Sequence, residues 1–288
     1  MTDIIRAIIL MVTSMFLFTL ADLFVKLASA SLSSGMVVTF MGAGTWLLFY
    51  GILRSRGQAI IAKSYWHYSV AIRTIGEVIA AAGIIISLSF VPLATVTAIL
   101  QAQPLFLTAA GALFLGEKVG IRRITAVLLG LLGVLIIIRP TSETISVGSV
   151  VVLIGVVGMT MRDAGSRLVP SHIPTLALGG IGAAGVTLFG VGLCLYEGSF
   201  SWPSGIAWFY VIAMIIAGTG GVYTITNAMR LGEVSIVSPF RYVKIIFGMG
   251  AGVLFLGEHI DGPTLIGSAI VTGAGLYAFL RERALAKR

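Results

Sequence analysis

Two charged residues, Arg73 and Glu77, stand four positions apart inside a long apolar stretch. Residues at this spacing share one face of a helix, so the two side chains can form an ion pair. A charge in hydrocarbon is costly, and an ionisable group there usually faces a cavity or a partner. We therefore expect both residues to bind a polar substrate, and Glu77 is also a candidate carrier of a coupling proton. The alternative is that Arg73 only extends its head group to the membrane surface.

Two further acid–base pairs have the same spacing of four positions. Asp22 precedes Lys26 near one end of its apolar stretch, and Asp163 precedes Arg167 near the opposite end of another. We expect these pairs to line the cavity or to act as gates at its two mouths. The alternative is ordinary pairing that anchors two helix ends.

Polar side chains at helical spacing mark one face of each of three more apolar stretches. We expect these faces to line the same cavity, so the candidate substrate-binding residues also include Thr97, Gln101, Tyr223, Asn227, Ser238, Tyr242 and Lys244. Pro104 and Pro239 fall in two of these stretches, and we expect both to act as hinges because a proline bends a helix. For any single hydroxyl, the alternative is an ordinary hydrogen bond between helices.

The composition indicates what kind of scaffold must position these residues. Of 288 residues, 58% are hydrophobic and only 10% are charged, and the mean hydropathy is +1.06. A soluble domain carries about 25% charged residues, so this chain cannot cover a surface that faces water. This excludes a soluble enzyme and a nucleic-acid-binding domain. The single cysteine, Cys194, excludes a disulfide framework and a cysteine-based metal cluster.

Ten apolar stretches are long enough to cross the membrane as helices, for which about 20 residues suffice. They cover roughly residues 4–29, 34–53, 66–89, 93–114, 123–138, 147–169, 174–195, 205–228, 234–256 and 263–281. We therefore expect an all-α membrane protein with ten transmembrane helices. Nearly all basic residues of the predicted loops fall on one side, Arg139 being the exception, which places both termini in the cytoplasm.

The chain also contains an internal repeat. A shift of 141 residues places Phe-Leu-Gly-Glu at 114–117 on Phe-Leu-Gly-Glu at 255–258. Each half, 1–141 and 142–288, holds five predicted spans, and an odd number of spans turns the second copy upside down. Inverted repeats are typical of secondary transporters, whose substrate site lies near the midplane between the repeats. The alternative is a duplicated structural bundle that transports nothing.

The halves resemble the drug/metabolite transporter superfamily, EamA type. The likeness rests on the Phe-Leu-Gly-Glu helix ends with the Gly-rich helix that follows each, on 133–140 at the close of the first half, and on 238–243 at the start of the ninth span. It implies a basket of ten helices around a central cavity that serves amino acids or other small metabolites. One departure is that Ile245 stands where the first half has Pro104, so we expect the two halves to bend differently.

These observations together predict a secondary transporter that works by alternating access and exports amino acids, aromatic or hydrophobic ones included, across a bacterial inner membrane. An arginine or lysine would bind the carboxylate of the amino acid. Backbone carbonyls, Gln101 or Asn227 would bind its amine. The rival interpretations are a channel or facilitator pore and a membrane receptor that binds small metabolites without transport. The expected partners are a small molecule and the lipid bilayer.

The sequence carries no metal-ligand spacing, no phosphate-binding glycine loop and no nucleophile–histidine–acid pattern. We therefore expect no enzymatic activity, no cofactor, no metal and no nucleic-acid partner. The sequence leaves the oligomeric state open, with a monomer as the simplest expectation.

Overall fold

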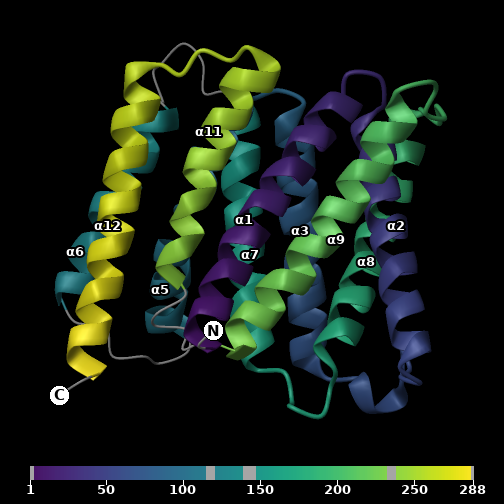
Figure 1. The fold of residues 1–288 in the computed structure, drawn as a ribbon, viewed down its shortest axis with the longest axis horizontal. Coiled ribbons are helices and arrows are strands. Elements are labelled where there is room, and N and C mark those ends of the chain that lie inside the picture. The colour runs from purple at the N-terminus through teal and green to yellow at the C-terminus, as the bar shows by residue number, and fades with distance from the viewer. Residues whose placement is uncertain (1–2, 115–120, 139–146, 232–237, 287–288) are drawn as a thin grey trace.

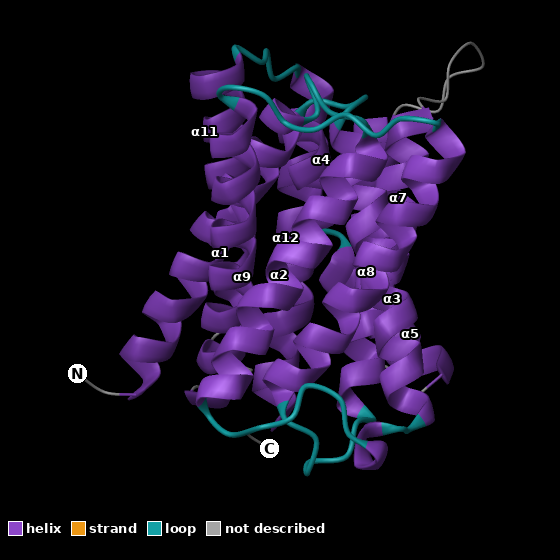
Figure 2. Ribbon diagram, turned by 90° about the vertical axis from the view of Figure 1, so that its right-hand side faces the viewer, coloured by secondary structure: helices purple, strands orange, loops and turns teal. Residues whose placement is uncertain are grey.

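The computed structural model describes residues 3–114, 121–138, 147–231 and 238–286. Within these ranges the regular structure is helical, without a strand. The helices run side by side between two ends of the molecule, where most of the connections lie (Figures 1 and 2). Helix α1 begins, and helix α12 ends, at the same end (Figure 1).

The helices follow one another closely along the chain. The first half contains α1 (Asp3–Ala28), α2 (Ser34–Ser55), the 3₁₀ turn η1 (Lys63–Tyr65), α3 (Tyr68–Leu88), α4 (Leu93–Leu100), α5 (Gln103–Phe114) and α6 (Ile121–Ile138). The second half contains α7 (Val147–Arg167), α8 (Thr175–Glu197), α9 (Ala207–Leu231), the 3₁₀ turn η2 (Ser238–Tyr242), α11 (Val243–Leu256) and α12 (Gly262–Ala286).

Six of these helices, α1, α2, α3, α7, α8 and α9, are long and apolar enough to cross a membrane. Shorter apolar helical segments cover Leu93–Leu107 and Ile124–Ile138. Large apolar side chains also face outward, such as Leu188 at 74% and Leu254 at 79% exposure. Such a surface suits lipid rather than water, and the chain is a multi-pass membrane protein.

The predicted fourth span is interrupted. Helix α4 ends at Leu100 and α5 begins at Gln103, and between them the amides of Gln101 and Ala102 donate to carbonyls three residues back. This tight turn precedes Pro104, which lacks a backbone N–H and disfavours helical geometry in the residue before it.

The second half contains an interruption at the matching place. The 3₁₀ turn η2 ends at Tyr242 and α11 begins at Val243, 141 residues after Gln101 and Ala102. The interruption is a short turn between two α-helices in the first half and a five-residue 3₁₀ segment in the second, so the expectation that the halves bend differently stays a prediction. The position of the break follows the repeat, although Pro104 has no proline counterpart.

Each helix of one half packs against a helix of the other half. Helix α3 lies against α7, α1 against α9, α2 against α8, and α6 against α12. Glycines permit the close approach: a Cβ on Gly83 of α3 would lie 2.7 Å from Cα of Gly155 in α7, and one on Gly42 of α2 would lie 2.6 Å from the amide of Thr187 in α8. Small residues of this kind let membrane helices pack backbone to backbone.

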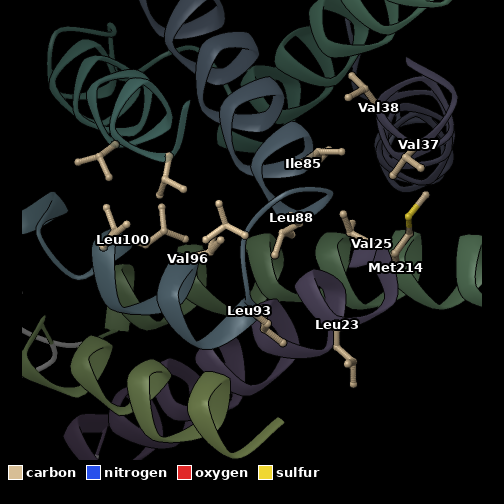
Figure 3. Packing of buried hydrophobic residues seen from close by; sticks show 14 of the residues in the cluster. Leu23, Val25, Val37, Val38, Ile85, Leu88, Leu93, Val96, Leu100 and Met214 are labelled. Carbon is tan, nitrogen blue, oxygen red and sulfur yellow. The ribbon is translucent and has the colours of Figure 1, made fainter. Parts of the chain in front are cut away.

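The short helix α4 lies in the largest hydrophobic cluster. Seven of its eight residues are buried, and in the close view Val96 lies between Leu100 of the same helix and Leu88 of α3 (Figure 3). The same cluster includes side chains of α1, α2, α7 and α9, so it joins both halves of the sequence. This packing fixes the ends of the helices that surround the site.

Candidate functional site

A cavity lies among α1, α2 and α3 of the first half and α7, α8 and α9 of the second. Its empty space is about 900 Å³, counted with the part that is open to the outside. The wall consists of Phe18, Ala21, Asp22, Val25, Met41, Gly42, Thr45, Phe49, Arg73, Glu77, Ala80, Ala81, Ile84, Ile85, Arg162, Gly179, Ala183, Val186, Gly218 and Val222. Most of these side chains are apolar, and the four charged ones carry both signs.

Glu77 lies between two guanidinium groups at this wall. Its Oε2 is 3.5 Å from NH2 of Arg73, the ion pair that the spacing predicts, and its Oε1 is 3.5 Å from NH1 of Arg162 in α7. Arg73 is only 8% exposed, and its NH1 donates to the carbonyl of Leu178 in α8 at 2.9 Å. The pair predicted within one helix is thus part of a cluster that spans three helices.

The cluster continues from Arg162 to Asp163. The Nε of Arg162 donates to Oδ1 of Asp163 at 2.9 Å. The other carboxylate oxygen accepts from Nε2 of Gln103 in α5 at 2.8 Å and lies 3.9 Å from NH1 of Arg241 in η2. The side chain of Arg167, the partner predicted for Asp163, lies outside the described residues.

Asp22 and Lys26 do not pair with each other, contrary to the prediction from their spacing. The carboxylate of Asp22 lies 2.9 Å from Nζ of Lys244 in α11, whereas Lys26 is 3.6 Å from Oε1 of Glu258. Local spacing failed here because each side chain finds an oppositely charged group on the other half of the molecule.

The 141-residue shift relates two of these contacts. Asp163 and Gln103 are the residues that correspond to Asp22 and Lys244 under this shift. Asp22 lies 2.9 Å from Lys244, and Asp163 lies 2.8 Å from Gln103. The two halves therefore make the same contact twice, once with a lysine and once with a neutral amide.

A second cluster, here called the Glu258 clamp, consists of Glu258, Lys26 and the first two amides of α4. The two carboxylate oxygens of Glu258 accept from the amides of Leu93 at 2.7 Å and Ala94 at 3.0 Å. The Nζ of Lys26 donates to the carbonyl of Val91 at 2.6 Å, and also to that of Leu88 at 3.2 Å. A carboxylate at a helix N-terminus satisfies unpaired amides and favours the helix dipole.

Backbone geometry positions the carboxylate of the clamp. Gly257 ends α11 in the left-handed conformation with φ +62°, and the amide of Glu258 then donates to the carbonyl of Gly252 at 2.9 Å. This explains why glycine and glutamate adjoin in the Phe-Leu-Gly-Glu motif: the glycine turns the chain and the glutamate reaches the other half. The first copy of the motif, with Glu117, lies outside the described residues apart from Phe114.

The remaining residues predicted for the fourth span do not line this cavity. Thr97 and Gln101 are buried in α4, at 1% and 5% exposure, and Thr97 packs against Gly248 of α11. Pro104 lies in the first turn of α5, directly after the break. Their roles as binding and hinge residues stay predictions.

The predicted residues of the eighth and ninth spans also lie away from the cavity wall. Tyr223 is 40% exposed, and the side-chain Nδ2 of Asn227 donates to the backbone carbonyl of Tyr223 at 2.8 Å in the same helix. Tyr242 is buried, and its side chain reaches Gly275 of α12. Ser238 and Pro239 lie in η2, and their side chains are outside the described residues.

The spacing of charged residues in the sequence selects neither Arg162 nor Glu258 as a site residue. Arg162 adjoins Asp163, so no spacing of four marked it, and its partner Glu77 lies on a distant helix. The repeated Phe-Leu-Gly-Glu motif was a signal for Glu258, but the amides it binds are 165 and 164 residues away. Among the described residues, no group of three or more His, Cys, Asp or Glu side chains could hold a metal ion.

Comparisons with known proteins give a consistent result. The profile of the EamA-like transporter family matches the chain twice, over residues 5–139 and 146–280. The pseudopaline exporter CntI of Pseudomonas aeruginosa (strain UCBPP-PA14) is 27% identical over 269 residues, which is 93% of each chain. The riboflavin transporter of Rhizobium johnstonii is 28% identical over 245 residues, covering 80% of this chain and 76% of that protein.

More distant proteins extend this likeness. The S-adenosylmethionine uptake transporter of Rickettsia felis is 22% identical over 204 residues, covering 68% of this chain and 66% of that protein. A crystal structure of an 18% identical protein superposes with a TM-score of 0.67 over 97% of this chain and 98% of the other. That likeness shows a shared fold.

Proposed function

Because the chain belongs to the EamA-like transporter family, we propose that it is a secondary transporter that moves a small metabolite through the cavity by alternating access. The cavity between helices of both halves, with charges of both signs on an otherwise apolar wall, is the observation that carries this proposal. The relatives named for pseudopaline, riboflavin and S-adenosylmethionine support transport of small metabolites. Chemical conversion of the substrate forms no part of the proposal.

The proposed architecture has ten transmembrane helices in two inverted repeats, residues 1–141 and 142–288. The contacts related by the 141-residue shift support it, and so do the matching breaks at Gln101 and Tyr242. We place both termini in the cytoplasm of a bacterial cell and the helices in its inner membrane, because the basic loop residues gather on that side.

The substrate class that best fits the cavity is an amino acid with an apolar side chain, and we propose export as the direction. Arg73 and Arg162 suit a carboxylate, while Asp22 suits an ammonium group. Phe18 and other apolar side chains of the wall suit the rest of the molecule. Asp22 replaces Gln101 and Asn227 as the proposed ligand of the amine.

The Glu258 clamp is the proposed gate at the end opposite the termini. It joins α11 of the second repeat to α1 and α4 of the first, so these helices separate only if the clamp opens. The 141-residue shift converts Lys26 and Glu258 into Arg167 and Glu117. We therefore propose, from the sequence, a corresponding gate at the cytoplasmic end.

Reconstitution into liposomes tests this function. Liposomes preloaded with an unlabelled amino acid should accumulate the same labelled amino acid by exchange, because a carrier that alternates access couples the two fluxes. A channel would conduct without such counterflow, and a receptor would bind without flux. Either result would overturn the proposal, and the substrate should leave the liposomes chemically unchanged.

A further inference from the structure

We propose that Arg162 is the residue that binds the substrate carboxylate, and that Glu77 occupies its site in the empty cavity as an internal carboxylate. This assignment rests on the proposed function and concerns the same cavity. Substrate would enter by ion-pair exchange: its carboxylate takes the place of Glu77 beside Arg162.

The guanidinium of Arg162 has one fixed edge. Its Nε donates to Asp163 at 2.9 Å, and Asp163 is itself held by Gln103 at 2.8 Å. A charge-assisted hydrogen bond of this length is strong and directional. Arg162 is therefore oriented before any ligand arrives, which reduces the cost of binding.

The opposite side of the guanidinium makes a looser contact at the cavity wall. Its NH1 lies 3.5 Å from Glu77, beyond the usual length of a charged hydrogen bond, and both residues line the cavity. One side of the Arg162 guanidinium is thus held by the short hydrogen bond to Asp163. The other side, with its longer contact to Glu77, can exchange that partner for a substrate carboxylate.

Exchange leaves Glu77 with a partner. Its second oxygen already lies 3.5 Å from NH2 of Arg73. Arg73 is itself held in place, because its NH1 donates to the carbonyl of Leu178 at 2.9 Å. A displaced Glu77 can remain paired with Arg73 while the substrate pairs with Arg162, so no buried charge is left alone. A buried charge left without a partner would destabilise the complex by more free energy than the new ion pair between the substrate and Arg162 contributes.

The 141-residue shift adds an independent argument. It relates Arg162 to Ala21 and Glu77 to Gly218, and both small residues also line the cavity. The charges of Arg162 and Glu77 are thus not duplicated at the positions related to them by the repeat. A substrate carboxylate therefore meets Arg162 on one side of the cavity only, which favours one orientation of the bound molecule.

This assignment predicts opposite effects for two substitutions. Glu77→Gln removes the internal competitor, so the Kd for L-phenylalanine should fall about tenfold, as expected when one competing ion pair is lost. Arg162→Lys should raise the Kd for L-phenylalanine at least about tenfold, because a lysine cannot keep the fork that binds Asp163 and a carboxylate together. Both variants should bind L-phenylalaninamide, which lacks the carboxylate, with near wild-type affinity.

The test measures ligand-dependent thermal stabilisation of the purified full chain in detergent, with the common L-amino acids, L-phenylalanine among them, and their carboxamides. Glu197→Gln serves as the matched control, since this exposed carboxylate at the end of α8 lies outside the cavity wall. Retained binding of the carboxamide shows that the Arg162 variant is folded.

The outcomes separate the assignment from the proposed function. If the wild type binds amino acids but Glu77→Gln weakens that binding, Glu77 is a ligand and the exchange is wrong. If Arg162→Lys loses acid and carboxamide equally while Glu77→Gln shows no gain, Arg162 does not recognise the carboxylate. If the wild type binds no amino acid, both the proposed substrate class and this assignment fail.

Discussion

The substitution Glu258→Gln should open the clamp and shift the protein away from the conformation described. The side chain of Glu258 is only 10% exposed, and its carboxylate accepts from the backbone amides of Leu93 and Ala94 in α4. A glutamine side chain has one acceptor oxygen, so one of the two amides loses its partner and faces an NH2 group instead.

The structure sets the size of this effect. An unsatisfied buried donor costs about 1–3 kcal/mol, and a negative charge at a helix N-terminus contributes about 0.3–1 kcal/mol. The pair with Lys26, at 3.6 Å and partly exposed, adds less than about 1 kcal/mol. A total of about 3 kcal/mol corresponds to a shift of about a hundredfold in the equilibrium between closed and open clamp.

Thiol accessibility measures the shift. In a chain with Cys194→Ala, the only native cysteine is gone, and Ala94→Cys places a reporter in the closed seam, where residue 94 is 3% exposed. The reporter should react with a membrane-impermeant maleimide much faster when Glu258→Gln is added. Phe90→Cys, at a position that is 72% exposed, should react at one rate in both backgrounds.

The matched control is Glu197→Gln, which also removes a carboxylate from a helix N-terminus. Glu197 accepts from the amide of Gly35 in α2 at 3.1 Å but has no lysine partner among the described residues. This variant should leave the Ala94→Cys rate near that of the parent. An unchanged rate in Glu258→Gln, with normal labelling at Phe90→Cys, would refute the assignment of the clamp as a gate.

Two further predictions concern packing and charge. Gly83→Val should destabilise the fold by about 1–3 kcal/mol, because the α3–α7 backbones are too close for a side chain, with Gly155 at 2.7 Å from a Cβ. Gly250→Val, with nothing within 4 Å of its Cβ, is the control, and equal thermal midpoints in detergent would contradict the packing argument. Asp22→Asn should lower transport strongly because it leaves Lys244 without its 2.9 Å partner. The double variant Asp22→Asn, Lys244→Met should recover part of the counterflow; no recovery would show that Asp22 acts on the substrate rather than on Lys244.

Features that depend on neighbouring residues could be predicted from the sequence. Apolar runs located the helices, and a spacing of four residues identified the pair of Arg73 and Glu77. The prediction for Asp22 and Lys26 used the same rule and was wrong, because the rule does not include charges on other helices. Lys244 and Glu258 compete for these two side chains, and their positions depend on how the halves pack.

The break in the fourth span shows a similar limit. The sequence identified Pro104 and Pro239 as causes of bends, but it did not place the second break at Tyr242, three residues after Pro239. The repeat predicts that break better than local composition does, because both halves pack in the same way against their partners. For the position of this break, the repeat was thus a stronger signal than local composition.

Two differences between the repeats allow a symmetric scaffold to hold an asymmetric set of charges at the cavity. Lys244 neutralises Asp22, but the corresponding residue beside Asp163 is Gln103, which carries no charge. The carboxylate of Asp163 is therefore available to Arg162 and Arg241, whereas Ala21 stands where the first repeat would have the counterpart of Arg162. The variant Gln103→Lys should therefore compete with Arg162 for Asp163 and lower the affinity for amino acids without changing the affinity for their carboxamides. Equal losses for both would show that Gln103 only supports the packing of α5 against α7.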